Sequence, residues 1–219
     1  MSIARIISTK KLTQAQKELL LNADISFIEA NFIETVPLNF ETDSHIENVI
    51  FTSQNAVKST VKKKIKIDNC FCVGDKTEAL LNDAGFKVVE KAYQAKALAK
   101  KIIENHPEKS FTFFCGDKRR EELPGILKKY GVNLREVQVY KTELTSRTIQ
   151  GDFDAVMFFS PSAVESFTKQ NLFEDLLVFC IGKTTEAEAK KYTNNIITAN
   201  KTTIENVIVQ VVKHYKQND

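Results

Sequence analysis

The amino-acid sequence predicts an α/β protein made of two similar domains, each with a parallel sheet, and three observations lead to this prediction. The segment VMFFSPSAV at residues 156–164 matches VIFTSQNAV at residues 49–57, with five of nine positions identical and an offset of 107 residues. A second pair, FCVGDKTEA at residues 71–79 and FCIGKTTEA at residues 179–187, has an offset of 108 residues. Short apolar segments also alternate with amphipathic ones along the chain, which is typical of parallel sheets covered by helices.

The first half of the chain alternates predicted strands with predicted helices. The strands are the apolar segments at residues 4–8, 49–52, 71–73 and 88–89. The helices have apolar residues at helical spacing and are expected at residues 12–21, 56–61, 77–82 and 95–104. Thr9 is the expected N-cap of the first helix, and Ala84-Gly85 is a normal signal for the end of the third. The basic run KKKIKI at residues 62–67 is expected to be a solvent-facing helix end and strand approach rather than a nucleic-acid patch.

The second half repeats this alternation. Its predicted strands lie at residues 111–115, 155–159, 178–181 and 196–197. Its helices are expected at residues 119–130, from residue 163 onward, after a turn at Thr184-Thr185, and at residues 203–215. Pro124 falls inside the first of these helices, so that helix should begin near Pro124 or kink there.

Two extended runs, at residues 25–38 and 132–144, are longer than the five or six residues of an ordinary strand and occupy equivalent places in the two repeats. Paired extensions of this kind could form a two-stranded β hinge between the domains and exchange strands between the two sheets. Within each sheet, a flavodoxin-like strand order is the expected one.

The composition is that of an ordinary globular protein, with 42% hydrophobic and 27% charged residues in a chain of 219. The net charge of +3 does not by itself indicate nucleic acid, but it suits a small anionic ligand. Neither a signal peptide nor a membrane-spanning run is recognisable. The four cysteines, Cys70, Cys72, Cys115 and Cys180, lack C-x-x-C spacing, so we expect buried reduced thiols in a cytoplasmic protein. The three histidines form no metal-binding pattern, and we expect no metal.

The residues that directly follow the predicted strands are the candidate binding residues, because open parallel sheets bind ligands beyond the carboxyl ends of their strands. Small residues let a ligand approach the backbone, and hydroxyl groups and helix N-termini offer hydrogen-bond donors to anions. These residues are Thr9, Lys10, Ser53, Gln54, Asn55, Gly74, Lys76, Thr77, Gly116, Asp117, Lys118, Arg119, Ser160, Pro161, Ser162, Gly182, Lys183, Thr184 and Thr185. Any single Ser or Thr among them could instead be only a helix cap.

The same turns lack the common catalytic and nucleotide-binding motifs. They contain no G-x-G-x-x-G, no phosphate-binding loop, no nucleophile elbow, no histidine and no paired carboxylates. Nucleotide binding and nucleophilic hydrolysis are therefore disfavoured.

With these motifs placed, the sequence resembles the uroporphyrinogen-III synthase family along nearly the whole chain. The order and spacing of the motifs carry the resemblance more than any single one. The motifs are IFTSQNAV at 50–57, VGDKTEALLNDAGF at 73–86, FFCGDKRREELPGILKKYGV at 113–132, VQVYKTE at 137–143, FFSPSAVESF at 158–167 and IGKTTEAEA at 181–189.

The resemblance implies two flavodoxin-like domains joined by a two-stranded ladder, with the chain beginning and ending in the same domain. One domain would then contain residues 1–36 plus 141–219, and the other residues 37–140. The implied substrate is hydroxymethylbilane, a linear tetrapyrrole that carries many carboxylates. It would be closed into a macrocycle with inversion of the last pyrrole and loss of water, without any cofactor. No nucleic-acid or membrane partner is implied, and a hinge between two lobes is compatible with a monomer.

The resemblance also suggests roles for particular residues. Tyr140, in VYKTE, matches the family tyrosine proposed to help the hydroxyl depart; the alternative is a tyrosine packed against the hinge. Thr77, Ser160 and Thr185 fall on family positions that would bind substrate carboxylates together with neighbouring backbone amides. The candidates for charge pairing are Lys76, Lys118, Arg119 and Lys183.

Two other functions stay open from the sequence alone. One is a non-catalytic two-domain binding protein that closes around a small polyanionic ligand. The other is an enzyme that acts on phosphorylated ligands, which the missing phosphate loops disfavour.

Overall fold

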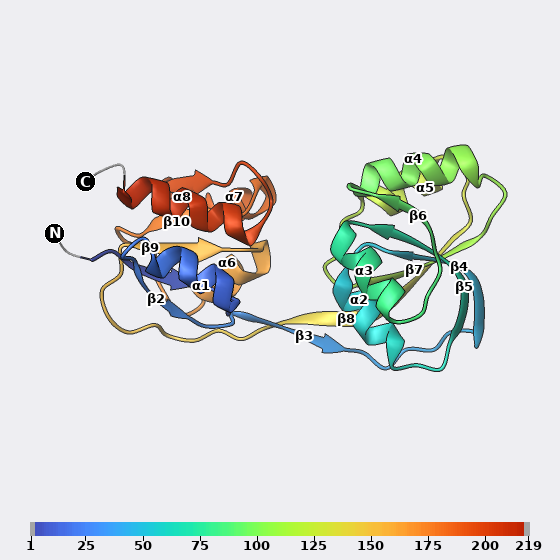
Figure 1. The fold of residues 1–219 in the computed structure, drawn as a ribbon, viewed down its shortest axis with the longest axis horizontal. Coiled ribbons are helices and arrows are strands. Elements are labelled where there is room, and N and C mark those ends of the chain that lie inside the picture. The colour runs from blue at the N-terminus through green and yellow to red at the C-terminus, as the bar shows by residue number, and fades with distance from the viewer. Residues whose placement is uncertain (1–2, 217–219) are drawn as a thin grey trace. The chain divides into compact units, whose positions relative to one another are not determined.

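The computed structural model describes residues 3–216 and divides the chain into two compact units (Figure 1). Unit 1 contains Met1–Glu34 and Glu143–Asp219, and unit 2 contains Thr35–Thr142. Unit 2 is therefore a continuous segment inserted into unit 1. The domain boundaries expected from the sequence, 36/37 and 140/141, lie in the two strands that link the units, β3 (Ile33–Pro37) and β8 (Leu134–Leu144).

Unit 1 is a five-stranded parallel sheet with helices on both faces. In space its strands follow the order β2-β1-β9-β10-β11. The strands are β1 (Arg5–Ser8), β2 (Ser26–Glu29), β9 (Ala155–Phe158), β10 (Leu177–Cys180) and β11 (Ile196–Thr198). The helices are α1 (Gln14–Leu21), α6 (Pro161–Thr168), α7 (Lys183–Ala189) and α8 (Ile204–Lys216). Counted along unit 1, the strand order is 2-1-3-4-5, which is the flavodoxin-like order expected from the sequence.

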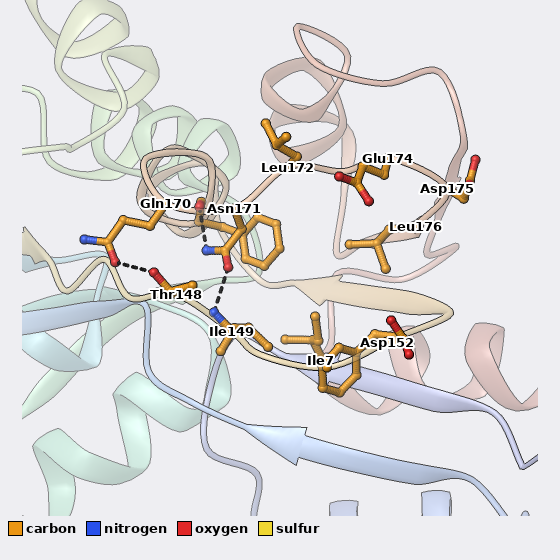
Figure 2. Close-up of a pocket in the computed structure, with 13 residues that line it drawn as sticks. Ile7, Thr148, Ile149, Asp152, Gln170, Asn171, Leu172, Glu174, Asp175 and Leu176 are labelled. Carbon is orange, nitrogen blue, oxygen red and sulfur yellow. Dashed lines mark hydrogen bonds between the residues drawn. The ribbon is translucent and has the colours of Figure 1, made fainter.

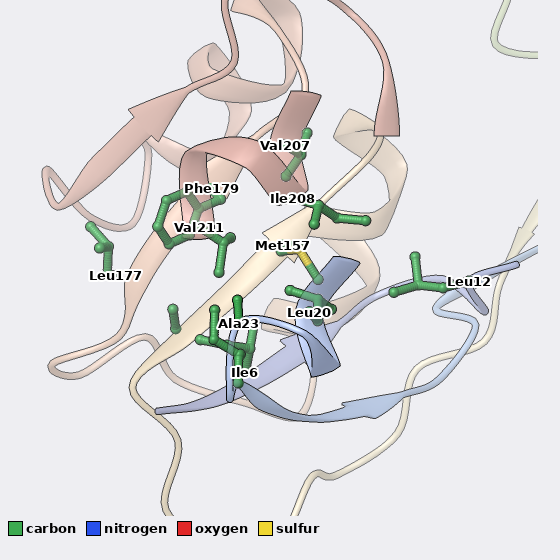
Figure 3. Close-up of a cluster of buried hydrophobic side chains, with 12 residues drawn as sticks. Ile6, Leu12, Leu20, Ala23, Met157, Leu177, Phe179, Val207, Ile208 and Val211 are labelled. Carbon is green, nitrogen blue, oxygen red and sulfur yellow. The ribbon is translucent and has the colours of Figure 1, made fainter. Parts of the chain in front are cut away.

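Alternation along β9 shows why both faces of this sheet need helices. Ala155 and Met157 point into one hydrophobic core, which α1 and α8 cover (Figure 3), whereas Val156 and Phe158 point into a second core on the face of α6 and α7. All four side chains are fully buried. An apolar strand with no polar face is typical of parallel sheets that are covered on both sides.

Unit 2 has the same layered construction around a six-stranded sheet with the order β3-β8-β7-β4-β5-β6. Its other strands are β4 (His45–Phe51), β5 (Lys66–Val73), β6 (Val88–Ala92) and β7 (Phe111–Gly116). Its helices are α2 (Gln54–Val61), α3 (Asp75–Asp83), α4 (Ala95–Asn105) and α5 (Glu122–Lys129). Helices α4 and α5 cover the core that contains Phe113, while α2 and α3 cover the core that contains Phe114.

The internal repeat explains the relation between the two sheets. The repeated segments place β4 and β5 of unit 2 in the positions of β9 and β10 of unit 1. The spatial order β8-β7-β4-β5-β6 then equals β2-β1-β9-β10-β11, although the chain enters unit 2 at a different strand. The strand exchange expected from the sequence is therefore present, and neither unit corresponds to one half of the sequence.

The linking strands β3 and β8 pair with each other, as the two overlong sequence runs predicted. The backbone N–H of Leu38 donates to the carbonyl of Val139 at 3.0 Å, and the N–H of Thr145 donates to the carbonyl of Phe32 at 3.0 Å. As the residue number rises along β3, the number of the hydrogen-bonded partner on β8 falls, so the two strands are antiparallel. The predicted fold class, two flavodoxin-like domains joined by a two-stranded β link, is confirmed.

Three features predicted for the starts of helices are wrong. Thr9 does not cap α1: its hydroxyl donates to the carbonyl of Met157 at 2.7 Å, and Thr13 forms a capping box with Gln16 instead. Helix α6 begins at Pro161 rather than residue 163, because proline is favoured in the first helical turn, where its missing N–H has no partner to lose. Thr184 and Thr185 lie inside α7, whose N-cap is Gly182.

Strands β4 and β5 are longer than the apolar segments from which they were predicted. The sequence pointed to residues 49–52 and 71–73, but pairing extends back to His45 and Lys66. The added residues of β4 alternate between exposed and buried positions, most of those of β5 are exposed or partly buried, and both sets include charged side chains, so neither forms an apolar run. Pro124 is the third residue of α5, inside the first turn where backbone N–H groups have no partner within the helix, so that helix begins near the proline as expected.

Candidate active site

The carboxyl ends of β4 and β7 form the centre of the candidate site in unit 2. These two strands are neighbours, and the connections that follow them run to opposite faces of the sheet: α2 follows β4 and α5 follows β7. Open α/β sheets bind their ligands at such a switch point, where the strand order reverses. Ser53 follows β4 and Gly116 ends β7, so two predicted site residues lie at this place.

Tyr140, on β8, reaches this switch point through its side chain. Its phenol donates a hydrogen bond to Oγ of Ser53 at 3.3 Å, although 87 residues separate the two in the sequence. Ser53 is also the N-cap of α2, since its Oγ accepts from the backbone N–H of Asn55 at 3.1 Å. The side-chain amide of Asn55 donates in turn to Oγ1 of Thr35 at 3.3 Å. The structure thus joins the predicted catalytic tyrosine to a predicted binding residue.

Gly116 lies directly against the ring of Tyr140. A Cβ at position 116 would come within 2.4 Å of ring atoms Cε2 and Cζ and within 2.8 Å of the phenol oxygen. A shift in register between Cys115 and Gly116 pairs Gly116 with Tyr140, and such irregularities re-aim side chains at functional edges. A side chain at position 116 would therefore displace the aromatic ring, which occupies that space.

The backbone around Tyr140 is tied to the turn after β7 by Asp117. The N–H of Asp117 donates to the carbonyl of Tyr140 at 3.2 Å, and Oδ1 of Asp117 accepts from the N–H of Thr142 at 2.9 Å. Burial raises the pKa of the Tyr140 phenol, against a smaller lowering by the Ser53 hydrogen bond. Tyr140 is therefore protonated at neutral pH and can donate a proton or a hydrogen bond.

The turn after β5 contributes Gly74, Lys76 and Thr77. Gly74 precedes α3 with φ of 86°, a conformation that L side chains rarely adopt, so glycine is required there. Lys76 is exposed, whereas Thr77 in the first turn of α3 is only 4% exposed.

Unit 1 has an equivalent set of turns. Ser160 caps α6 by accepting from the N–H of Ala163 at 3.2 Å, as Ser53 caps α2, and Ser162 is buried in the first turn of the same helix. Gly182 precedes α7, whose residue Thr185 is 1% exposed in the place that Thr77 occupies in unit 2. Lys183 and Thr184 are exposed beside them.

The two buried threonines keep hydroxyl groups that can serve a ligand. Neither Thr77 Oγ1 nor Thr185 Oγ1 makes a hydrogen bond to another residue within 3–216. Within the same residues, the fully buried side-chain oxygen that lacks a partner is that of Thr42. Thr77 and Thr185 both lie in the first turn of a helix, beside N–H groups where anions are favoured.

The predicted basic residues differ in their surroundings. Lys118 is exposed after β7, but the Arg119 guanidinium forms ion pairs with Glu121 and Glu136. Arg119 also lines a hollow of about 390 Å³, together with Cys115, Gly116, Asp117, Glu136 and Gln138. Two glutamates already neutralise part of the positive charge of Arg119, which makes this arginine the weaker candidate for pairing with a substrate carboxylate.

Sequence reasoning missed the residues that hold Tyr140 in place. Thr35 was not singled out, and Asn55 and Asp117 were noted only as members of turns. Their hydrogen bonds connect positions 20 and 25 residues apart, so no local sequence pattern indicates these contacts. The apolar character of the segment around Gly116 indicated a strand, but only the structure shows the ring that lies on the glycine.

A second hollow, in unit 1, does not suit a polyanion. It has a volume of about 410 Å³ and lies among the segments that precede β9 and β10, at the amino ends of those strands (Figure 2). Asp152, Glu174 and Asp175 contribute carboxyl groups to it, and its lining contains neither Lys nor Arg. Asn171 fixes one wall, since its Oδ1 accepts from the N–H of Ile149 at 2.8 Å.

The described residues contain no group of three or more His, Cys, Asp or Glu side chains placed to hold a metal ion. Across the same part of the chain, no helix is long and apolar enough to cross a membrane. The four cysteines are buried and free of disulfides, and burial raises the pKa of the Cys115 thiol beside the site to about 11. That thiol is therefore protonated at neutral pH and a poor nucleophile.

Solved structures of two bacterial proteins are among those that have this fold. The uroporphyrinogen-III synthetase of Helicobacter pylori 26695 superposes with a TM-score of 0.76 at 18% identity, covering 97% of this chain and 100% of that one. A mutant uroporphyrinogen III synthase of the extremely thermophilic bacterium Thermus thermophilus gives a TM-score of 0.59 at 13% identity, covering 99% and 100%. At these identities the likeness concerns the fold.

Sequence comparison identifies the family. The porphyrin biosynthesis protein HemD of Ruminiclostridium josui is 25% identical over 155 residues, which is 64% of this chain and 31% of that protein. The chain thus spans about a third of the length of this curated relative. The family model described as uroporphyrinogen-III synthase HemD matches residues 14–208, which is most of both units. With the expected fold present as well, the chain belongs to the uroporphyrinogen-III synthase family.

Proposed function

We propose that this protein closes hydroxymethylbilane into uroporphyrinogen III, with inversion of the last pyrrole ring and loss of water, as a cyclising hydro-lyase that needs no cofactor. The observation that carries the proposal is the Tyr140 phenol, held by Ser53 and Gly116 at the switch point of a chain that belongs to this family. Membership of the family favours this enzyme over a non-catalytic binding protein.

The chemistry suits a site that has few strong acids and bases. A hydroxymethylpyrrole can expel its hydroxyl with electron push from its own ring nitrogen, so the enzyme mainly has to fold the substrate and select the attacking carbon. Correct positioning can contribute about 7–11 kcal/mol to lowering a barrier. One general acid typically contributes about 10²- to 10⁴-fold in rate. Tyr140 would act by donating a hydrogen bond or proton to the departing hydroxyl.

The substrate carboxylates would be bound mainly by helix starts. Thr77 and Thr185 offer hydroxyl groups beside the backbone N–H groups of α3 and α7. The exposed side chains Lys76, Lys118 and Lys183 would add positive charge near these turns. Hydrogen bonds from hydroxyls and amides are suited to carboxylates that have to be released again after closure, because their individual strength is modest.

Replacing Tyr140 by phenylalanine is expected to lower kcat for ring closure by about 10²-fold, because the ring stays and only the donor is removed. Activity would be measured with hydroxymethylbilane, with the type I and type III products separated by chromatography. The spontaneous reaction, run without enzyme, gives the baseline. An unchanged kcat would remove the catalytic role and leave Tyr140 as a packing residue.

Replacing Thr185 by valine, which has nearly the same shape, is expected to raise KM and leave kcat within about twofold. A hydrogen bond to a charged group is worth about 1.5–3 kcal/mol, which corresponds to at least a tenfold change in binding. The matched control is Thr168→Val on α6, because that hydroxyl donates to backbone carbonyls of its own helix. Equal KM values for the Thr185 variant and the wild type would exclude Thr185 from binding.

The same assay separates the enzyme from the binding-protein alternative. A binding protein would retain hydroxymethylbilane without increasing the type III product over the spontaneous reaction. We also propose that the protein is a monomer. We further propose that it acts in the cytoplasm, since the free buried thiols fit a reducing compartment. Sedimentation of the purified protein would test the monomer.

A further inference from the structure

Ser53 accepts two hydrogen bonds from within the protein. Its Oγ receives the phenol proton of Tyr140 at 3.3 Å and the backbone N–H of Asn55 at 3.1 Å. A hydroxyl oxygen has two lone pairs, so both acceptor positions are used. The hydroxyl keeps one proton to donate, which either the phenol oxygen of Tyr140 or a substrate carboxylate could accept.

The pair Ser53–Tyr140 is held from both sides. Ser53 is fixed at the start of α2, and the side chain of Asn55 in the same turn is bound to Thr35 of β3 at 3.3 Å. On the other side, Gly116 lies against the ring of Tyr140 and leaves it no room to move toward β7. The phenol oxygen is thus located by one hydrogen bond and by the contact of the ring with a backbone.

The duplicate copy in unit 1 supports a special role for Ser53. Ser160 occupies the equivalent position and also caps its helix, α6, here by accepting from the N–H of Ala163, three residues along the chain. No tyrosine phenol donates to Ser160 among the described residues. Helix capping therefore accounts for a serine in both copies, whereas the tyrosine contact belongs to one copy only.

We propose that Ser53 is a positioning residue for Tyr140 and does not bind a substrate carboxylate. Without substrate, Ser53 accepts the phenol proton and fixes the phenol oxygen; when that proton turns to the departing hydroxyl, the Ser53 hydroxyl donates its own proton to the phenol oxygen. The proposal rests on the proposed function of Tyr140 in ring closure. Loss of the Ser53 hydroxyl leaves the phenol free to rotate about its C–O bond and lets the ring shift. The rate of the chemical step falls, while the affinity for substrate is retained, because the other turns bind the carboxylates.

The test compares Ser53→Ala, Ser53→Thr, Tyr140→Phe and the double variant Ser53→Ala/Tyr140→Phe in the ring-closure assay. Ser53→Ala is expected to lower kcat by about tenfold with KM within about twofold, since misplacement of a reacting group is costly. Ser53→Thr restores most of kcat, because position 53 has an extended backbone that accepts threonine and keeps the hydroxyl. The double variant is expected to match Tyr140→Phe alone, as two residues that act as one unit do.

Loss of the helix cap is separated from loss of positioning by Thr13→Ala. Thr13 caps α1 of unit 1 by accepting the N–H of Gln16 and is not one of the candidate binding residues, so its loss should lower stability by about 1 kcal/mol with kcat unchanged. A Ser53→Ala variant with higher KM and unchanged kcat, or with an effect that adds to that of Tyr140→Phe, would overturn the proposal. A wild-type rate for Tyr140→Phe would refute the catalytic role of Tyr140, and the positioning role of Ser53 with it. A wild-type rate for Ser53→Ala together with a slow Tyr140→Phe would refute only the positioning role of Ser53.

Discussion

Replacing Gly116 by alanine is expected to lower kcat for ring closure by about 10²-fold, since a displacement of about 1 Å at a reacting group can cost that much. The added methyl group would lie 2.4 Å from two ring carbons of Tyr140, closer than nonbonded atoms can approach. The ring has to move, and its phenol then leaves Ser53. Steady-state kinetics with hydroxymethylbilane measures the loss, and circular dichroism verifies that the variant is folded.

The matched control for this substitution is Gly125→Ala. Gly125 lies on α5 of the same unit, and a Cβ there would meet nothing within 4 Å. This change is expected to leave kcat unchanged and to increase stability by about 0.5–1 kcal/mol, because alanine favours a helix over glycine. Wild-type kcat in a folded Gly116→Ala variant would contradict the view that the position of the Tyr140 ring sets the rate of ring closure.

Replacing Phe158 by alanine is expected to lower the free energy of unfolding by about 3–5 kcal/mol. Phe158 on β9 is fully buried and has edge-to-face contacts with Phe167 at 5.4 Å and Phe173 at 5.8 Å between ring centroids. Removing it opens a cavity between the sheet and α6 and removes two aromatic contacts. Urea denaturation followed by circular dichroism measures the change in the unfolding midpoint.

Leu172→Ala provides the control for Phe158. This leucine is 74% exposed, so its removal from the surface should change stability by less than about 0.5 kcal/mol. A similar loss for both variants would mean that the second core of unit 1 does not have the packing described above.

Much of the fold could be predicted because it is periodic. The apolar strands of unit 1 and the repeat at residues 49–57 and 156–164 indicated a doubled parallel sheet, and the two long runs indicated the strands that link the units. The predictions that were wrong concern local features, such as the residue that caps a helix. Thr9 and Thr13 are both acceptable caps, and the choice between them depends on Met157, which lies far along the chain.

The candidate site was predictable only in part, for the same reason. Placing Ser53 and Gly116 after strands needs only the rule that parallel sheets bind at their carboxyl ends. The contact of Tyr140 with both of them depends on the shifted register between β7 and β8. A shift of this kind arises from the packing of whole strands, and neither the residue types nor their spacing encodes it locally.

The insertion of one unit within the other has a consequence for synthesis on the ribosome. Unit 2 is a continuous segment, so all of its strands emerge together and can pair at once. In unit 1, β1 lies between β2 and β9, and β9 is translated only after the whole of unit 2. A nascent chain therefore carries only the β1–β2 pair of this sheet, with the edge of β1 unpaired, until β9 has been made. Pairing between residues so far apart in the sequence is expected to make unit 1 fold more slowly than unit 2.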